Sequence, residues 1–305
     1  MQQAILCPGQ GAQYVGMGKD FYESHAPARR VYSMADEVLG FPLSNLCFHG
    51  PDNQLQQTDN AQVGIFVTTV AIYETLKSLN KLPQNIDVTA GLSLGEYSAL
   101  YIADAIALPD AIRLVRARGE LMQAAAVAQP STMLALVGAE EAAAAEICGQ
   151  AQAHGTIVMA NFNAPGQIVL SGGIEACGEA AKIAQAMGLR SVPLNVAGAF
   201  HSPFMQSAAD KMREILATVN IQMPRMAVIS NVTARPHESV EQIRALLVEQ
   251  IIAPVRWSQS MMYLKDQGTQ AFMELGPGRV LTGLMKKIDR RAAITNISTL
   301  ETLAA

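Results

Sequence analysis

The chain has 305 residues, of which 50% are hydrophobic and 16% charged, and its formal net charge is −4. This composition supports a large buried core, and the negative charge argues against a nucleic-acid-binding protein, which would usually be basic. No apolar run is long enough to cross a bilayer, and the N-terminus lacks the basic start of a signal peptide. We therefore expect a globular protein with no membrane segment.

The cysteines and histidines give no sign of a metal or redox site. The four cysteines are scattered without a C-x-x-C pair, and the five histidines lack the spacing of metal ligands. Free thiols are expected, and they favour a cytoplasmic location. The cysteines are Cys7, Cys47, Cys148 and Cys177.

The first apolar run, residues 4–7, predicts a strand that leads into a glycine-containing loop at 8–13. The loop is not a P-loop, and the third glycine of a dinucleotide-binding fingerprint would fall at Tyr14. Its glycines would still let backbone N–H groups approach a ligand, which makes the main chain of Gln10 a candidate donor to an oxyanion. A plain tight turn explains the loop equally well.

Residues 16–82 are predicted to be mainly helical, with breaks at Pro27, at Pro42 and across the polar stretch 49–60. Within them, the apolar run 63–79 predicts a helix that packs against the sheet.

A nucleophile elbow is the next feature. A short predicted strand, the sequence Gly-x-Ser-x-Gly centred on Ser93, and a helix-forming run over 96–107 follow one another. Such a turn lifts the serine hydroxyl clear of the sheet, and Gly91 and Gly95 leave room for backbone that passes close by. The N–H of Leu94, at the start of the helix, can then point at an oxyanion.

A buried arginine is predicted on the following helix, which we expect Asp110 to cap and which extends to about Val127. At 3.6 residues per turn Arg118 falls on the apolar stripe, whereas Arg116 and Glu120 lie on the other face and can pair. An inward-facing arginine is rarely unpaired. It could form a structural ion pair with a protein carboxylate, or it could be kept free for a carboxylate on a substrate.

A second unit begins after Pro130, where the sequence pattern changes. The expected order is strand 133–137, helix 139–153, strands 157–161 and 167–171, helix 175–187 and strand 191–196. This βαββαβ order is that of a ferredoxin-like unit. We expect a small ferredoxin-like subdomain over 129–197, inserted in a large α/β domain of residues 1–128 and 198–305, with a cleft between them.

The chain leaves the small subdomain through the loop 198–203, which carries His201. A lone histidine is more often structural than catalytic, but this one lies at the domain junction, so both readings stay open. Gln250 lies near the end of a helix predicted over 240–252 and could reach the same cleft.

Two further short strands are predicted at 227–230 and 272–274, and a helix follows the second. That helix carries a cluster of basic residues, and a cluster of this kind is usually only a solvent-exposed face. Its members are Lys286, Lys287, Arg290 and Arg291.

Seven short stretches, spread over almost the whole chain, carry a further signal. They are residues 8–13, 91–96, 116–119 with Met122, 161–167, 198–202, 254–257 and 274–278. In sequence and in order they resemble the malonyl-CoA:acyl carrier protein transacylase family, which includes the acyltransferase domains of polyketide and fatty-acid synthases. The resemblance implies an α/β fold with an α/β-hydrolase-like core and an inserted ferredoxin-like subdomain.

For the reacting groups, the resemblance implies that Ser93 is the nucleophile and His201 its base. It implies that the main-chain N–H groups of Gln10 and Leu94 form the oxyanion hole. It also implies that the backbone carbonyl of Gln250 orients the imidazole in place of a triad acid, and that the reaction needs no cofactor.

For the substrate, the resemblance implies that Arg118 holds the malonyl carboxylate and that Asn161 and Phe200 belong to the binding site. Phe200, just before the histidine, matches the malonyl-selective form of its motif. The family usually has a histidine before the nucleophile, and this chain has Leu92 there. That position lies beside the acyl pocket, so Leu92 bears on the fine choice of acyl group.

The implied activity is transfer of a malonyl group from malonyl-CoA to the phosphopantetheine thiol of acyl carrier protein, through a malonyl-serine ester. It would serve fatty-acid synthesis or act in trans on a polyketide line, and the carrier's acidic surface would meet the basic cluster. Nothing in the sequence demands more than a monomer.

Two other functions stay open. A proofreading acyl hydrolase acting on acyl carrier protein thioesters would use the same Ser93 and His201, although uncharged acyl chains have no use for a buried Arg118. A non-catalytic acyl-carrier-binding module is the third reading, and the intact Ser93, His201 and Arg118 argue against it.

Overall fold

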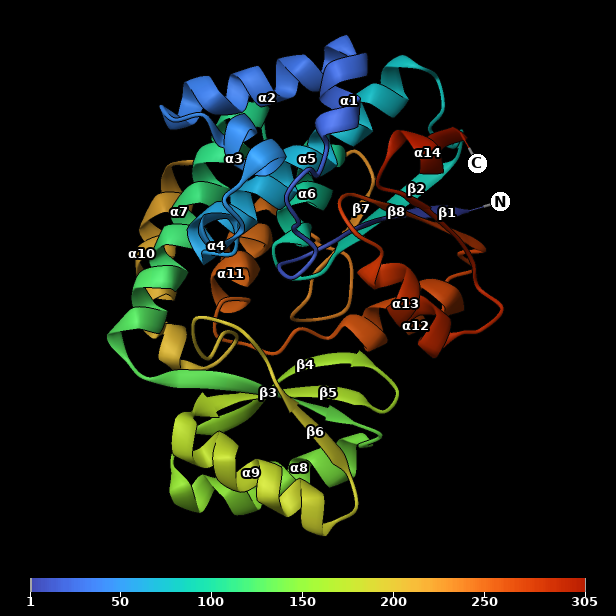
Figure 1. Cartoon of the computed structure of the whole chain (residues 1–305). Helices are drawn as coiled ribbons and strands as arrows, with labels where there is room; N and C mark the ends of the chain where they lie inside the picture. Colours follow the sequence, from blue (N-terminus) through green and yellow to red (C-terminus); the bar gives the residue numbers. More distant parts are fainter. Residues whose placement is uncertain (1, 305) are drawn as a thin grey trace.

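The computed structural model describes residues 2–304, and its central element is a five-stranded parallel sheet (Figure 1). The strand order is β7-β2-β1-β8-β9, and every neighbouring pair is parallel. The pairing of β1 with β2 reaches Cys7 and Gly91 at their carboxyl ends, so the loop at 8–13 starts beside the elbow. The strands are β1 (Gln3–Cys7), β2 (Ile86–Gly91), β7 (Ala227–Ile229), β8 (Ala271–Leu275) and β9 (Ala293–Ile297).

Helices cover both faces of this sheet. The side chains of β1 alternate between two cores: Ile5 packs with the helices of one face and Leu6 with those of the other. Within residues 2–304, no helix combines the length and apolarity needed to span a bilayer. The first face carries α1 (Lys19–Ser24), α2 (Ala26–Leu39), α3 (Leu43–His49), α4 (Asp52–Leu55), α5 (Thr58–Ser78), α6 (Gly95–Ile102), α7 (Leu108–Ala128), α10 (Gln206–Thr218) and α11 (Val240–Glu249), and the second carries α12 (Trp257–Asp266) and α13 (Val280–Ile288). The short α14 (Leu300–Ala304) follows β9.

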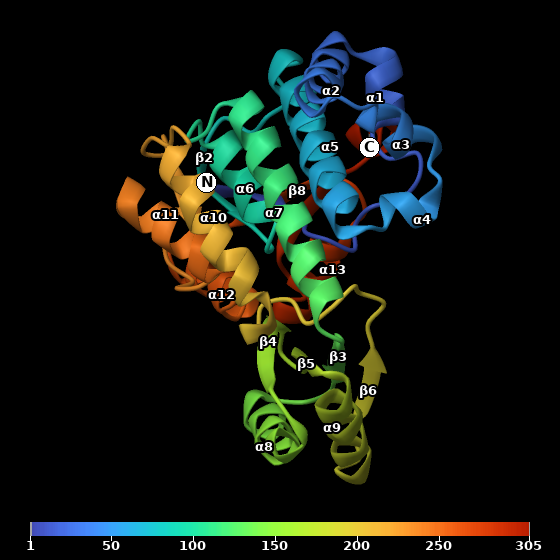
Figure 2. The ribbon, with the colours of Figure 1, turned by 90° about the vertical axis from the view of Figure 1, so that its left-hand side faces the viewer.

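The second sheet is antiparallel, with the order β4-β5-β3-β6. It has a core of its own, formed with two helices that lie on its side away from the large sheet (Figures 1 and 2). The α/β fold with a separate βαββαβ unit is therefore confirmed. We propose the division into 129–197 and the rest of the chain on this basis. The elements are β3 (Ser131–Val137), α8 (Glu141–Ala151), β4 (Ile157–Ala164), β5 (Gln167–Gly173), α9 (Ile174–Ala186) and β6 (Arg190–Pro193).

Several sequence predictions need correction. Asp110 does not cap α7: the helix begins at Leu108, and Asp110 lies in its first turn, where a carboxylate favours the helix dipole. The helix after the elbow ends at Ile102 and not near residue 107, because Asp104 adopts a left-handed φ of 59°. The elements α12, β9 and α14 were not predicted.

Candidate active site

The elbow between β2 and α6 holds Ser93 in a left-handed conformation, with a φ of 52°. A Cβ at Gly91 would lie 1.9 Å from the carbonyl carbon of Gly95, and a Cβ at Gly95 would lie 2.1 Å from the carbonyl oxygen of Cys7. Both positions therefore require glycine, as predicted. The side chain of Asn231 braces the turn: its Oδ1 accepts the Ser93 N–H at 2.6 Å, and its Nδ2 donates to the Gly91 carbonyl at 2.7 Å.

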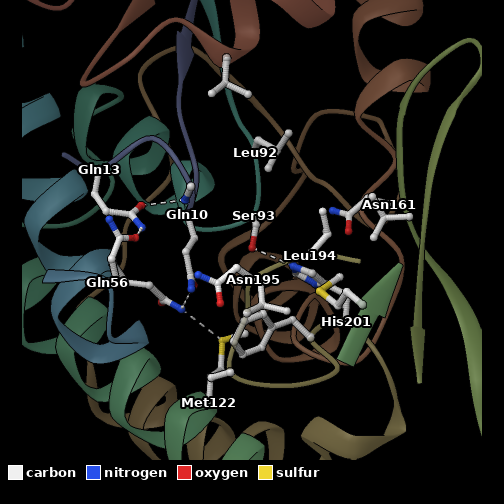
Figure 3. Close-up of a pocket in the computed structure, with 18 of the residues that line it drawn as sticks. Gln10, Gln13, Gln56, Leu92, Ser93, Met122, Asn161, Leu194, Asn195 and His201 are labelled. Atoms are coloured by element: carbon white, nitrogen blue, oxygen red, sulfur yellow. Dashed lines mark hydrogen bonds between the residues drawn. The ribbon is translucent and has the colours of Figure 1, made fainter. Parts of the chain in front are cut away.

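His201 lies opposite the serine, on the loop before α10. The Ser93 Oγ and His201 Nε2 are 2.8 Å apart (Figure 3). The His201 Nδ1 is 2.7 Å from the backbone carbonyl of Gln250. Since a carbonyl only accepts hydrogen bonds, Nδ1 carries the proton of the neutral ring. The Nε2 is then free to accept the proton of the serine hydroxyl.

Burial and the nearby Arg118 guanidinium determine the charge of this histidine. Loss of solvation in the interior, followed by repulsion from Arg118, lowers the pKa of His201 to about 4. The imidazole is therefore neutral at neutral pH, which is the form that a general base needs.

Arg118 is fully buried on α7 and points at the serine. Its Nη2 donates to the Ser93 Oγ at 3.0 Å and to the Gln250 side-chain oxygen at 2.9 Å, and its Nη1 donates to the Gln62 Oε1 at 2.6 Å. Its Nε has no protein partner, and no carboxylate in residues 2–304 forms an ion pair with it. The sequence leaves two roles open for Arg118: a structural ion pair with a protein carboxylate, or binding of a carboxylate on the substrate. The described residues contain no such ion pair, which favours the second role. Arg116, two residues earlier, forms the predicted pair with Glu120 at 2.6 Å.

A cavity of about 500 Å³ lies over Ser93, between the large sheet and the antiparallel one. Gln10, Leu92, Ser93, Asn161 and His201 all line it, as Figure 3 shows. Eleven of its lining side chains are carboxamides and none is a carboxylate, so a neutral polar ligand or an anion meets no charge repulsion from acidic groups there. Its apolar part contains Met122, Met133, Val169, Leu194, Phe200, Val280 and Leu284.

The structure brings the candidate residues together in two groups. Ser93, His201, Arg118 and Gln250 are linked by direct hydrogen bonds. Gln10, Leu92, Asn161 and Phe200 line the cavity around them, and Leu94 follows the serine at the start of α6. Among the described residues, neither the Gln10 nor the Leu94 N–H donates a hydrogen bond to another backbone or side-chain group.

Four polar residues of this site were missed by the sequence analysis. They reach it from α5, from α6 and from the loop after β7, and apart from Glu96, which lies within the stretch 91–96, no local motif contains them. They are Gln62, Glu96, Asn231 and His237.

A serine on a strand–helix elbow, hydrogen-bonded to a neutral histidine, is the arrangement of proteins that transfer acyl groups through an acyl-enzyme. Residues 5–301 match the acyl transferase domain family. The chain belongs to this family and is an acyltransferase.

Within this family, the chain is similar to several proteins that are named as malonyl transacylases. The chain is 42% identical over 304 residues to the malonyl CoA-acyl carrier protein transacylase of Bacillus subtilis strain 168, with 98% of this chain and 94% of that protein covered. The crystal structure of an acyl-carrier-protein S-malonyltransferase from Bartonella henselae superposes with a TM-score of 0.96 at 38% identity, over 100% of this chain and 98% of that one. A malonyl-transacylase solved in complex with a type II polyketide acyl-carrier protein gives a TM-score of 0.96 at 34% identity, with the same coverage.

Proposed function

We propose that this protein transfers the malonyl group from malonyl-CoA to the phosphopantetheine thiol of acyl carrier protein, by a ping-pong route through a malonyl ester of Ser93. The carrier would belong to fatty-acid synthesis or to a polyketide line. One observation carries the proposal: the Ser93 Oγ lies within hydrogen-bonding distance of both a neutral base, His201, and a buried guanidinium, Arg118, that has no protein carboxylate. The neutral imidazole of His201 suits acyl transfer through the serine, and the guanidinium of Arg118 suits an acyl group that ends in a carboxylate.

In the first half-reaction, the His201 Nε2 takes the proton of the Ser93 hydroxyl while the oxygen attacks the thioester carbonyl carbon. The carbonyl electron pair moves onto its oxygen, and the free N–H groups of Gln10 and Leu94 are the proposed donors to this oxyanion. In comparable sites one such donor lowers the barrier by about 3 kcal/mol. As the intermediate collapses, the carbon–sulfur bond breaks, and the coenzyme A thiolate takes the proton from His201.

The second half-reaction reverses these roles. The phosphopantetheine thiol gives its proton to the His201 Nε2, and its sulfur attacks the ester carbonyl. The bond from the carbon to the Ser93 Oγ breaks, and the serine recovers the proton. The Gln250 carbonyl keeps the same imidazole tautomer throughout.

The cavity suits the rest of the substrate. Arg118 would turn from the Ser93 Oγ to the malonyl carboxylate, which can also use its unpartnered Nε–H. Asn161 and the other carboxamides are proposed partners for the amides of the pantetheine arm. Leu92 and Phe200 would form apolar walls beside the acyl chain.

The test of this proposal is the intact mass of the protein after mixing with malonyl-CoA or acetyl-CoA, followed by addition of carrier protein bearing phosphopantetheine. We expect a malonyl adduct that disappears as malonyl-carrier protein forms. Rapid hydrolysis of acetyl or longer acyl adducts, with malonyl-CoA ignored, would contradict the proposal and favour the proofreading hydrolase.

The pH dependence of serine acylation follows from the state of His201. Because a protonated imidazole cannot accept the serine proton, and the pKa of His201 is lowered to about 4, kcat/KM for malonyl-CoA is expected to stay nearly constant from about pH 5 to 8 and to fall only below that range. The check is the initial rate of coenzyme A release at several pH values. A rate that halves near pH 6.5 would show an imidazole titrating at its ordinary value and would contradict the expectation.

The basic cluster of Lys286, Lys287, Arg290 and Arg291 is the proposed docking surface for acyl carrier protein. All four residues are exposed, and the Lys287 Nζ donates to the Gln167 Oε1 at 2.9 Å. Gln167 lines the cavity, so the cluster borders the route by which a carrier-bound arm would enter.

Reversal of two charges tests this surface. In Lys287→Glu with Arg291→Glu, we expect the carrier concentration for half-maximal transfer from the malonyl-enzyme to rise about tenfold, since each rim charge contributes up to about 1 kcal/mol. The measurement is the single-turnover rate of transfer against carrier concentration. Lys182→Glu, the same change on α9, is the control and should have no effect. An unchanged concentration dependence in the double variant would rule out this docking surface.

A further inference from the structure

Glu96 is a buried carboxylate that the mechanism above does not use. It lies three residues after the nucleophile, in the first turn of α6, and is fully inaccessible to solvent. Its Oε2 accepts the Asn231 N–H at 3.0 Å and the Gln250 Nε2 at 2.7 Å, and its Oε1 is 2.9 Å from the His237 Nε2. A buried carboxylate with three partners is well satisfied, so its orientation is fixed.

Two of these partners hold the peptide groups of the nucleophile itself. Asn231 accepts the Ser93 N–H at 2.6 Å, and the Gln250 Nε2 donates to the Ser93 carbonyl at 3.0 Å. Ser93 has a left-handed φ that a non-glycine residue adopts only when its surroundings enforce it. Glu96 in turn bonds both of these residues: it accepts the backbone N–H of Asn231 and the side-chain Nε2 of Gln250.

Gln250 also connects Glu96 to the guanidinium. Its side-chain oxygen accepts from the Arg118 Nη2 at 2.9 Å, while its nitrogen donates to Glu96 at 2.7 Å. A side-chain amide could in principle face either way, but here one end needs an acceptor and the other a donor. The carboxylate of Glu96 selects the orientation in which the amide oxygen faces Arg118.

We propose that Glu96 is the positioning residue of this site, holding Ser93 through Asn231 and aiming Arg118 through the side-chain amide of Gln250. Glu96 touches no substrate. Through Gln250 it supplies the negative charge that balances the buried guanidinium without contacting it, so Arg118 has no protein carboxylate as a direct partner and can bind the carboxylate of an acyl group. The inference rests on the proposed function, because it concerns how Arg118 selects a malonyl group.

The deciding quantity is the ratio of the Ser93 acylation rates with malonyl-CoA and acetyl-CoA, since a ratio does not depend on the fraction of folded protein. In Glu96→Gln the side chain keeps its size but loses its charge, and a neutral hydrogen bond orients the Gln250 amide less firmly than a charged one. We expect the ratio to fall roughly fivefold or more in this variant. In an Arg118→Ala background, Glu96→Gln should leave the ratio unchanged, because the amide then has no guanidinium to aim.

Glu274→Gln is the matched control. Glu274 is equally buried and accepts three hydrogen bonds, from the Leu281 N–H and from the N–H and hydroxyl of Thr282, but it does not contact the serine. Its loss should leave the ratio unchanged.

Equal losses with both thioesters in Glu96→Gln would show a merely structural role and overturn the inference. If Glu96→Gln does not fold, Glu96→Asp replaces it in the experiment. Its shorter side chain holds the carboxylate one methylene farther from Gln250, and the ratio of the acylation rates with malonyl-CoA and acetyl-CoA is again the deciding measurement. A wild-type protein that forms no malonyl adduct would instead refute the proposed function, so the two failures are distinguishable.

Discussion

Arg118→Ala is expected to reverse the acyl preference of this protein. A bidentate, charge-assisted contact to the malonyl carboxylate is lost, so acylation by malonyl-CoA should fall by about 100-fold or more. Acetyl-CoA has no carboxylate to lose, and the smaller side chain widens the pocket, so its rate should change far less. The measurement is the rate of adduct formation at Ser93 with each thioester, followed by intact mass.

The neighbouring arginine supplies the control. Arg116→Ala removes the same charge from the same helix, but Arg116 is bound to Asp59 at 3.1 Å and to Glu120 at 2.6 Å, away from Ser93. Its loss should leave the malonyl-to-acetyl ratio unchanged. If Arg118→Ala slowed both thioesters equally, Arg118 would be a structural residue, because a packing defect does not distinguish the two acyl groups.

The fold was predictable wherever the signals are local. The elbow has its glycines and serine within five residues, and the βαββαβ unit alternates short apolar runs with helical ones. Strand β9 was missed because it lies at the edge of the sheet and is mostly not buried, so its hydrophobic pattern is weak. Helix α12 was missed although Trp257, Met261 and Leu264 lie on its buried side at helical spacing, because Ser258 and Ser260 are buried beside them and interrupt the apolar pattern.

The site was predictable only in part, for the same reason. Helical periodicity alone placed Arg118 on an inward face, and the domain junction pointed to His201. The partners of these residues are distant in sequence: Gln62 lies 56 residues before Arg118, and His237 lies 141 residues after Glu96. A buried polar residue is chosen by the group it must satisfy, and that group is visible only once the chain is folded.

Glu96 illustrates this limit most clearly. In the sequence it is one acidic residue in the first turn of a helix, a common position that the helix dipole explains. In the structure its Oε2 accepts the backbone N–H of Asn231 and the side-chain Nε2 of Gln250, the two residues that hold the nucleophile and the arginine. Its helical position accounts for where it lies, and its three partners account for the chemistry that we propose for it.

Ser93→Ala is expected to have the largest effect of any single substitution. Without the hydroxyl no acyl-enzyme can form, so the malonyl adduct should disappear and transfer to carrier protein should fall by about 10⁴-fold or more. His201→Ala should cost a similar factor, because the hydroxyl then lacks its base. Both losses are measured by intact mass and by the rate of malonyl transfer to carrier protein.

Since Ser93 and His201 act as one unit, the double variant should be scarcely slower than Ser93→Ala alone. Ser98→Ala is the control: it removes a buried hydroxyl that has no hydrogen-bond partner in residues 2–304, five positions along the same segment, and should leave both the adduct and the transfer rate unchanged. A malonyl adduct that persists in Ser93→Ala would place the nucleophile elsewhere. Losses that multiply in the double variant would show that Ser93 and His201 act independently, contrary to the 2.8 Å hydrogen bond that joins them.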